Sequence, residues 1–546
     1  MHSTSQHSQS GAAQEAAISP KTGAVRTCSI TSLGCPKNLV DSESMIGRLL
    51  SHGFELVEEA PSVDLLLVNT CGFLREATQE AKEVIAEACA LKEAGAVGKL
   101  LVAGCAVVSD GKALRDEFPL VDVWVSPYDE VNIAKIVAAL FADSDSDAQP
   151  SAATSASPLP NLLPMVERPN VEATRAEAKF YYDQAKSIPL DSAPRAALTE
   201  PHVAYVKIAD GCDRFCSYCT IPKIRGRYAS KPMEAILEEL RKLADTGVRE
   251  VNLIAQETTF WGMDLYGQPQ LAKLLREIQA LGLFDWVRTL YTYPLYWTKE
   301  LTELFALQPQ GTTSILPYID VPLQHCNSEI LKQMNRRVDK AQTIDLIEQL
   351  RAEIPNVVLR SSWIVGFPGE TDKQYQELAD FIEKYRFERS GVFEFSPEPG
   401  APAEKMPNQV DPKVKHTRYE RLYAKQERVS RQYARGLIGQ IRDVILDARQ
   451  ISETGVVMKN VCVGRTYADA PDVDPVVYVT GRNLEPGSII PCEIVDAHGL
   501  DLIAVPADPD KLFVTKKERK IQRLQQEREN AENEAAQNAK PKRRRN

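Results

Sequence analysis

The sequence predicts an α/β protein of several domains: an open parallel α/β domain, a partial (β/α)6 barrel of the TIM type, and a small antiparallel β-barrel, in that order. Strand and helix patterns alternate in residues 24–142 and again in residues 201–396, which is typical of parallel sheets flanked by helices. Residues 436–505 instead carry short β-type runs separated by turn signals. The length of 546 residues is too great for one hydrophobic core and favours about three domains.

In the first domain, each strand pattern is followed by a helix pattern, and a cysteine follows each of the first three strands. Cys35, Cys71 and Cys105 are separated by 36 and 34 residues, which matches one strand–helix unit each. Since the carboxyl ends of parallel strands meet at one edge of a sheet, the three thiols are expected to converge. The alternative is that all three are packing residues, because free cysteines are often buried. We expect strands at 27–33, 63–69, 99–103 and 121–125, and helices at 40–52, 74–93, 110–117 and 129–141.

A second set of three cysteines, Cys212, Cys216 and Cys219, lies in the stretch ADGCDRFCSYCTIP with the spacing C-x3-C-x2-C. Clusters of the 4Fe–4S type are normally held by four thiolates, so three ligands leave one iron free to bind a small molecule. The alternatives are a zinc site or a set of buried thiols. Zinc sites more often use two C-x2-C pairs or mixtures of Cys and His, and no second pair lies nearby.

The second domain repeats the strand–helix alternation, and polar residues follow several of its strands. Catalytic groups in such barrels sit at the carboxyl ends of strands, where Gln256, Glu257, Gln324, His325 and Gly366 are expected. A structural, hydrogen-bonded role is the better prediction for His325, and an inert one for Cys326. Gly366 and Gly369 would let the backbone approach a ligand closely, although this short glycine pattern is a weak signal. We expect strands at 203–208, 249–255, 287–292, 317–322, 357–365 and 391–395, and helices that include 232–245 and 371–385.

The third domain has an acidic composition. Residues 436–505 contain five basic and ten acidic residues, which is the opposite of what phosphate neutralisation requires. The balance predicts that this barrel docks a basic protein through acids such as Asp469, Asp472 and Asp474, with a merely solvated acidic surface as the alternative. Cys462 and Cys492 fit its core, and Cys28 and Cys89 fit the core of the first domain.

The remaining segments suggest no chemistry of their own. Residues 1–23 are polar and predict a disordered tail, residues 143–200 a linker or insertion, 411–433 a charged solvated helix, and 506–546 a charged tail. The tail ends in KPKRRRN, which could touch RNA or only maintain solubility. The net charge of −10 disfavours a nucleic-acid binder as a whole, and no apolar run predicts secretion or a membrane span. Eleven cysteines in such a chain are typical of metal-binding or catalytic thiols in a cytoplasmic protein.

The Cys212 stretch resembles the signature of the radical S-adenosylmethionine enzymes, and the chain from about residue 24 to 505 resembles the methylthiotransferase family. The motifs SLGCPKNLVDSE, NTCGF, YIDVPLQH, IVGFPGET and EFSPEPGAPA look like its RimO branch, whereas tRNA-modifying relatives usually carry GCQMN in place of GCPKN. The resemblance implies a methylthiotransferase domain at 24–142, a radical S-adenosylmethionine barrel with a trailing helix at 201–435 and a TRAM domain at 436–505. It also implies cofactor contacts at Tyr218, Gln256, Ser362 and Gly366, and no catalytic residue beyond the cluster ligands.

The implied function is methylthiolation of the β-carbon of an aspartate in small-subunit ribosomal protein twelve, with two 4Fe–4S clusters and S-adenosylmethionine. One cluster is assigned to Cys35, Cys71 and Cys105, and the other to Cys212, Cys216 and Cys219. An electron donor such as flavodoxin or ferredoxin is implied as a partner, together with the ribosomal protein, free or on the ribosome. Two alternatives stay open: a tRNA adenosine methylthiotransferase, and a non-catalytic iron–sulfur factor in ribosome assembly.

Overall fold

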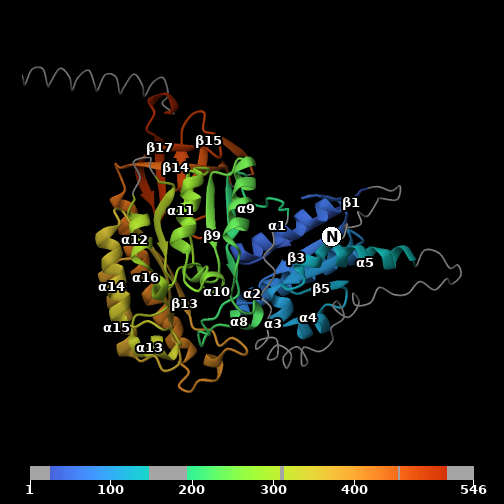
Figure 1. The fold of residues 1–546 in the computed structure, drawn as a ribbon, viewed down its shortest axis with the longest axis horizontal. Coiled ribbons are helices and arrows are strands. Elements are labelled where there is room, and N and C mark those ends of the chain that lie inside the picture. Colours follow the sequence, from blue (N-terminus) through green and yellow to red (C-terminus); the bar gives the residue numbers. More distant parts are fainter. Residues whose placement is uncertain (1–24, 59, 147–193, 308–312, 453–454, 513–546) are drawn as a thin grey trace, which may run out of the picture.

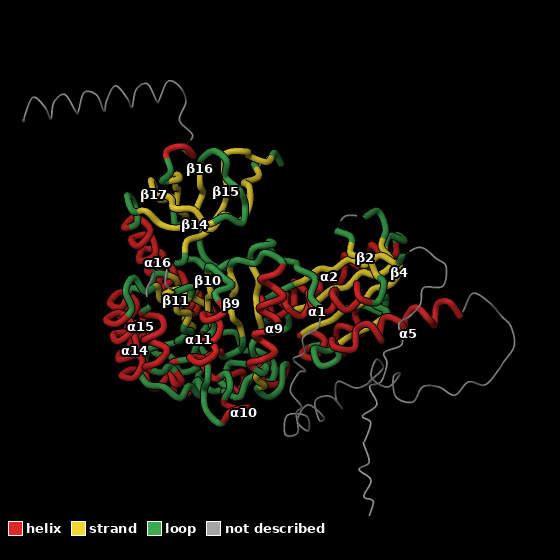
Figure 2. Tube along the Cα trace, turned by 45° about the horizontal axis from the view of Figure 1, so that its top comes forward, coloured by secondary structure: helices red, strands yellow, loops and turns green. Residues whose placement is uncertain are grey.

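A computed structural model describes residues 25–58, 60–146, 194–307, 313–452 and 455–512. An N-terminal domain lies beside a central barrel, and a small C-terminal barrel covers one end of the central one (Figures 1 and 2). The predicted tail 1–23, most of the predicted linker 143–200 and most of the tail 506–546 lie outside the described residues. None of the described helices has the length and apolar character needed to cross a membrane.

The N-terminal domain is a five-stranded, all-parallel sheet in the order β2-β1-β3-β4-β5. The strands predicted by alternation are confirmed, but the short edge strand β2 was not predicted, because three residues give too little pattern. Cys28 and Cys89 pack in the cores on the two faces of this sheet, as expected. The elements are β1 (Arg26–Ser32), α1 (Pro36–Ser51), β2 (Phe54–Leu56), β3 (Val63–Thr70), α2 (Arg75–Glu93), β4 (Val97–Gly104), α3 (Cys105–Ser109), α4 (Gly111–Glu117), β5 (Val123–Val125) and α5 (Ile133–Ser146).

The central domain is a six-stranded parallel sheet in the order β13-β12-β11-β10-β9-β6, with β6 and β13 as its two edges. This confirms the predicted partial barrel. The strands are buried on both faces, as parallel strands covered by helices are, and β9 is buried along its whole length. Its strands are β6 (Val203–Lys207), β9 (Glu250–Ile254), β10 (Trp286–Thr289), β11 (Ile315–Asp320), β12 (Val358–Val365) and β13 (Arg389–Glu394), and a two-residue hairpin is formed by β7 (Ala209–Asp210) and β8 (Ala229–Ser230). Its helices are α8 (Ile221–Ile224), α9 (Met233–Asp245), α10 (Met263–Tyr266), α11 (Leu271–Leu281), α12 (Lys299–Ala306), α13 (Ser328–Gln333), α14 (Lys340–Glu353), α15 (Asp372–Tyr385) and α16 (Pro412–Gly436).

The C-terminal domain is a closed five-stranded barrel in the order β14-β15-β16-β18-β17. Four strand pairs are antiparallel, as predicted, whereas β16 and β18 are parallel. Cys462 and Cys492 are fully buried in its core, which confirms the prediction for them. The strands are β14 (Ile441–Ile451), β15 (Val457–Thr466), β16 (Val477–Thr480), β17 (Ile489–His498) and β18 (Asp501–Pro506).

The loop between β15 and β16 enters the amino-terminal end of the central barrel. Asp469 is 1% exposed and forms an ion pair with Arg389 of β13, while Asp474 accepts a hydrogen bond of 2.5 Å from Tyr318 of β11. Asp472 accepts a hydrogen bond from the hydroxyl of a tyrosine in β6. Asp469 and Asp474 therefore hold the two barrels together and are not available to a basic partner, whereas Asp472 is exposed. Docking of a basic protein on this domain stays a prediction.

The end of the predicted linker also joins two domains. Arg195 forms ion pairs with Glu43 of α1 and with Glu239 of α9, the latter at 2.5 Å. Leu198 N donates a hydrogen bond of 2.9 Å to Glu43. Burial opposes the charge of Glu239, but Arg195 and a neighbouring lysine hold its pKa below the ordinary value. Residues 194–200 therefore fasten the N-terminal domain to the side of the central barrel.

Candidate functional site

Three cysteines of the N-terminal domain meet at the carboxyl edge of its sheet. Cys35 is the residue before α1, Cys71 follows β3, and Cys105 begins α3 directly after β4. The strands before them, β1, β3 and β4, are neighbours in the sheet. A Cβ atom on Gly34 would lie 2.6 Å from the Cβ of Cys71, so the first loop packs directly on the second. Gly34 also has a φ of +87°, which explains the glycine at this close approach.

The thiols of this group influence one another electrostatically. Burial raises the pKa of Cys71, and the charge of a Cys35 thiolate raises it further. Burial raises the pKa of Cys105 to about 12, with smaller contributions from thiolates at Cys35 and Cys71. Three thiolates gathered in a buried place need positive charge to stay ionised, and the irons of a cluster would supply it. The donor set therefore fits an iron–sulfur cluster.

The three cysteines of the central barrel lie in the loop between β7 and α8. The Cys219 N–H donates to the Cys216 carbonyl at 3.0 Å, which curls the loop tightly. Burial raises the pKa of Cys212 to about 12, and the charge of Cys216 adds to this; the pKa of Cys219 is raised for the same two reasons. This donor set also fits a cluster.

In the described part of the chain, no three His, Cys, Asp or Glu side chains are arranged to hold one metal ion.

The four residues expected to contact S-adenosylmethionine lie at or near the carboxyl ends of the barrel strands. The Tyr218 hydroxyl accepts a hydrogen bond of 3.2 Å from Arg336. Gln256 follows β9; its Nε2 donates to Asp210 at 2.8 Å, while its Oε1 is enclosed without a partner. That orphaned oxygen is a position where a bound molecule would supply a donor.

The other two expected contacts are less distinctive. Ser362 lies within β12, and its carbonyl accepts a hydrogen bond from Gln324 N at 2.8 Å. The Gly366 N–H already donates to Glu370, and Lys415 lies where a Cβ would be, so packing and its φ of +71° account for this glycine.

His325 and Cys326 are both fully buried at the same end of the barrel. The Nδ1 atom of His325 accepts a hydrogen bond of 2.9 Å from Asn327 N, and its Nε2 lies 3.6 Å from Glu370 Oε1. This supports the structural role predicted for His325. Burial raises the pKa of Cys326 to about 12, which agrees with its predicted inertness.

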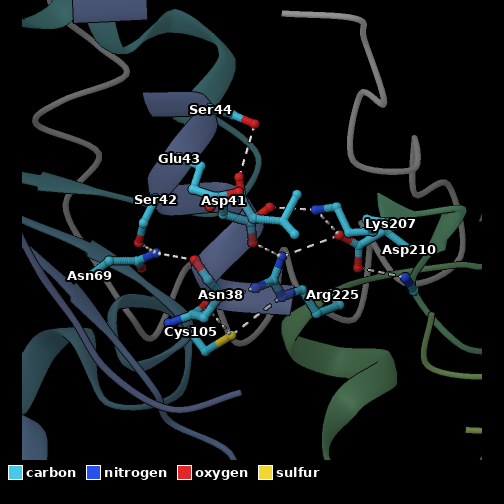
Figure 3. Close-up of polar contacts among 12 residues, drawn as sticks. Asn38, Asp41, Ser42, Glu43, Ser44, Asn69, Cys105, Lys207, Asp210 and Arg225 are labelled. Carbon is cyan, nitrogen blue, oxygen red and sulfur yellow. Dashed lines mark hydrogen bonds and ion pairs between the residues drawn. The ribbon is translucent and has the colours of Figure 1, made fainter. Parts of the chain in front are cut away.

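A buried ion network beside Cys105 joins the N-terminal domain to the central barrel, and Figure 3 shows it. Asp41 of α1 accepts hydrogen bonds from Lys207 and, at 2.7 Å, from Arg225. Asp210 accepts from the same two cations at 2.7 and 3.2 Å. Arg225 also donates to Cys105 Sγ at 3.3 Å and to an asparagine of α1 at 3.0 Å. We call Asp41, Lys207, Asp210 and Arg225 the interdomain ion network.

The charges of this network stabilise one another against the cost of burial. Burial opposes the ionised form of Asp210, but Lys207 and Arg225 hold its pKa well below the ordinary value. Burial likewise opposes the charge of Lys207, and Asp210 and Asp41 raise its pKa. Breaking a buried pair by removing one partner typically costs about 3–5 kcal/mol, so the network fixes how the two domains meet.

The four residues of this network were not predicted from the sequence. A signal was present in SLGCPKNLVDSE, where Asn38 and Asp41 are three residues apart and therefore share one face of α1. The partner residues come from another domain, and no local pattern relates Arg225 to Asp41.

Comparisons with known proteins agree with this architecture. Residues 206–382 match the model of the Radical SAM superfamily, residues 27–126 that of the Uncharacterized protein family UPF0004, and residues 438–506 that of the TRAM domain. Two relatives, from Geobacter sulfurreducens and Desulforamulus reducens, are both named "Ribosomal protein uS12 methylthiotransferase RimO". Each is 39% identical to this chain and aligns with 87% of it, over 97% and 98% of their own lengths respectively.

The matches show that the protein is a radical S-adenosylmethionine enzyme that uses S-adenosylmethionine and 4Fe–4S clusters. The chain, with its three matched domains and relatives of this identity, belongs to the RimO family of methylthiotransferases.

Proposed function

We propose that this protein methylthiolates the β-carbon of an aspartate in ribosomal protein uS12, as the names of its relatives indicate. The observation that carries the proposal is the placement of two three-cysteine sites on either side of one buried interface, with Arg225 reaching from the barrel to Cys105. A reaction that needs both a radical and a sulfur requires two such sites close to each other.

In this proposal Cys35, Cys71 and Cys105 hold one 4Fe–4S cluster and Cys212, Cys216 and Cys219 hold the other. When bound, the clusters and S-adenosylmethionine supply a hydrogen-abstracting radical and a methylated sulfur. One C–H bond of the aspartate breaks, with the hydrogen leaving on 5′-deoxyadenosine. One C–S bond would form to a methylthio group, made from a sulfur held at the Cys35, Cys71 and Cys105 cluster and the methyl group of a second S-adenosylmethionine. The bond between that sulfur and iron would break, and the remaining electron would return to the cluster.

The residues of the chain position these groups and exclude water. Tyr218, Gln256, Ser362 and Gly366 are the proposed contacts of S-adenosylmethionine. Burial of Cys105, Cys212, Cys216 and the interdomain ion network would keep solvent away from a radical, which would otherwise react with it.

The proposal also covers the electron donor, the cellular compartment and the basic tail. The electron donor is a low-potential carrier such as flavodoxin or ferredoxin. The protein works in the cytoplasm, where reduced thiols persist. The basic end of the tail, KPKRRRN, contacts ribosomal RNA beside the target protein.

The domain division is likewise proposed: a tail at 1–23, a methylthiotransferase domain at 24–142, a linker at 143–200, a barrel with a trailing helix at 201–435, a TRAM domain at 436–505 and a tail at 506–546. The family matches at 27–126, 206–382 and 438–506 support it.

The test is mass spectrometry of uS12 and of tRNA from a strain that lacks this gene, complemented with the wild-type protein or with Cys212→Ala. Loss of a methylthio group from uS12, restored by the wild-type protein alone, is expected. Loss from tRNA would instead establish the tRNA methylthiotransferase. Full restoration by Cys212→Ala would support the non-catalytic assembly factor.

A further inference from the structure

Lys37, two residues after Cys35, is a buried cation without a carboxylate partner. Its side chain is 8% exposed, and among the described residues its one recorded polar contact is the ring of Tyr291, whose centroid lies 3.2 Å from Nζ. A cation–π contact stabilises an ammonium ion less than an ion pair with a carboxylate would in an enclosed place. Lys37 therefore lacks the counter-charge that buried lysines normally have.

Asp41, which lies on α1 with Lys37, and Asp320, which is hydrogen-bonded to Tyr291, are already used. Asp41, one turn further along α1, accepts from Lys207 with Oδ1 and from Arg225 with Oδ2. Asp320 accepts from Arg360 with Oδ1 at 3.0 Å and from the backbone N–H of Tyr291 with Oδ2 at 2.8 Å. Neither acid makes an ion pair with Lys37.

Lys37 lies in the first turn of α1, and a positive charge is unfavourable at the amino end of a helix. It is the second residue of α1, whose first turn contains no acidic residue and whose preceding residue makes no side-chain cap. The amino end of a helix carries partial positive charge and favours anions. Pro36 has no N–H, and the N–H groups of Asn38 and Leu39 donate to the Cys35 carbonyl, so the helix end contributes its partial positive charge beside the ammonium rather than a set of free donors.

The partner ring lies at the mouth of the central barrel. Tyr291 follows β10, at the edge where Gln256 and the Cys212 loop also lie. Its φ of +60° is unfavourable for a tyrosine, and two bonds hold it there: its N–H donates to Asp320, and its carbonyl accepts from Thr258 N at 3.0 Å. The ring thus holds the ammonium of Lys37 between the loop of the first cysteine site and the barrel mouth.

The ammonium of Lys37 faces the barrel, because the Tyr291 ring of the central domain lies over it.

We propose that Lys37, together with the first turn of α1 and the Tyr291 ring, forms the subsite that binds the side-chain carboxylate of the substrate aspartate. The inference rests on the proposed function. The β-carbon that reacts is bonded directly to this carboxylate, so holding the carboxylate fixes the reacting C–H bond. A lysine is a compact point charge that suits one carboxylate oxygen at the centre of a tight site.

The experiment measures binding of uS12 to the reconstituted holoenzyme with S-adenosylmethionine and no reductant, so that no turnover occurs. Two forms of uS12 are compared: the natural one, and one whose target aspartate is replaced by asparagine. The enzyme variants are wild type, Lys37→Met, Lys37→Arg, and Lys112→Met, which alters an exposed lysine of α4 as a matched control. Iron content and unfolding temperature establish that each variant is folded.

The wild type and Lys112→Met are expected to bind the aspartate form roughly 10- to 100-fold more tightly than the asparagine form, the range for a hydrogen bond between charged groups. Lys37→Met should bind both forms equally, and Lys37→Arg should keep part of the preference. A preference that survives in Lys37→Met overturns the inference, as does an effect of Lys37→Met on S-adenosylmethionine affinity alone. If the wild type does not bind uS12 at all, the proposed function fails instead.

Discussion

The Nε atom of Arg225 lies 3.3 Å from the sulfur of Cys105, although the two residues belong to different domains. Arg225 ends the short helix α8, and Cys219 lies two residues before that helix begins. One turn of helix therefore connects a thiol of the barrel site to a hydrogen-bond donor at the N-terminal site. Movement of the Cys212 loop would therefore move Arg225 and change its hydrogen bond to Cys105.

We expect Arg225→Gln to lower the reduction potential of the N-terminal cluster. Hydrogen bonds to cluster sulfurs and nearby positive charge stabilise the reduced state, and the variant loses the charge. The measurement is a redox titration followed by electron paramagnetic resonance, in a background where Cys212, Cys216 and Cys219 are alanine. Arg227→Gln, which removes an exposed partner of Asp213, is the control and should leave the potential unchanged.

The same variant leaves two buried carboxylates without one of their cations, at a cost of about 3–5 kcal/mol. Arg225→Lys retains the charge and should recover part of both losses. A potential that is the same in Arg225→Gln and in the control would show that the contact with Cys105 has no electrostatic effect on the cluster.

The two cysteine sites should be separable. Replacing Cys35, Cys71 and Cys105 together with alanine is expected to leave about four of roughly eight irons, since the other three ligands lie on a different domain. This variant should still cleave S-adenosylmethionine but form no methylthio product. Iron analysis and product chromatography test this, and a folded variant without any iron would contradict it.

Much of the fold was predictable because it follows from local patterns. Strand and helix alternation gave the two parallel sheets, and the position of Cys35, Cys71 and Cys105 after consecutive strands gave the edge where they meet. These features depend on residues close in sequence.

The interfaces between domains were not predictable, because they join residues far apart in the chain. In the sequence, Asp469 is one of ten acidic residues of the C-terminal domain and has no feature that distinguishes it. In the structure it is buried in an ion pair with Arg389. In the sequence, Lys37 is one residue of the motif SLGCPKNLVDSE. Its contact with the Tyr291 ring, in place of a carboxylate, depends on how the two domains pack.

Cys326 should resist alkylation over a wide pH range. Its pKa of about 12 lies well above the ordinary value near 8.5, so the reactive thiolate is scarce in the folded protein. We expect iodoacetamide at pH 8 to label Cys326 only after denaturation, as read by peptide mass spectrometry. Above the ordinary thiol pKa the unfolded chain loses this proton while the folded protein keeps it. Deprotonation then favours the unfolded state, so the stability should fall above about pH 8.5. Rapid labelling of the folded protein would contradict the burial of this thiol.

Asp469→Asn should loosen the C-terminal barrel from the central one. The substitution leaves the guanidinium of Arg389 buried without its counter-charge, and Asp469 also accepts from the Thr466 hydroxyl at 2.6 Å. Loss of one partner of such a pair costs about 3–5 kcal/mol. Hydrogen exchange in β14–β18 and the denaturant midpoint measure the effect, and Glu493→Gln, at an exposed position of the same domain, should change the stability by no more than about 0.5 kcal/mol.

Replacing both Asp469 and Arg389 by apolar residues tests whether the pair acts through charge or through shape. A well-packed apolar pair should recover much of the stability, because no unpaired charge stays buried. Equal losses for Asp469→Asn and Glu493→Gln would show that the ion pair does not hold the two barrels together. It follows that docking of a basic protein on the acidic C-terminal barrel must be probed at exposed acids, Glu485, Glu493 and Asp496, because charge reversal at Asp469 would first disrupt this interface.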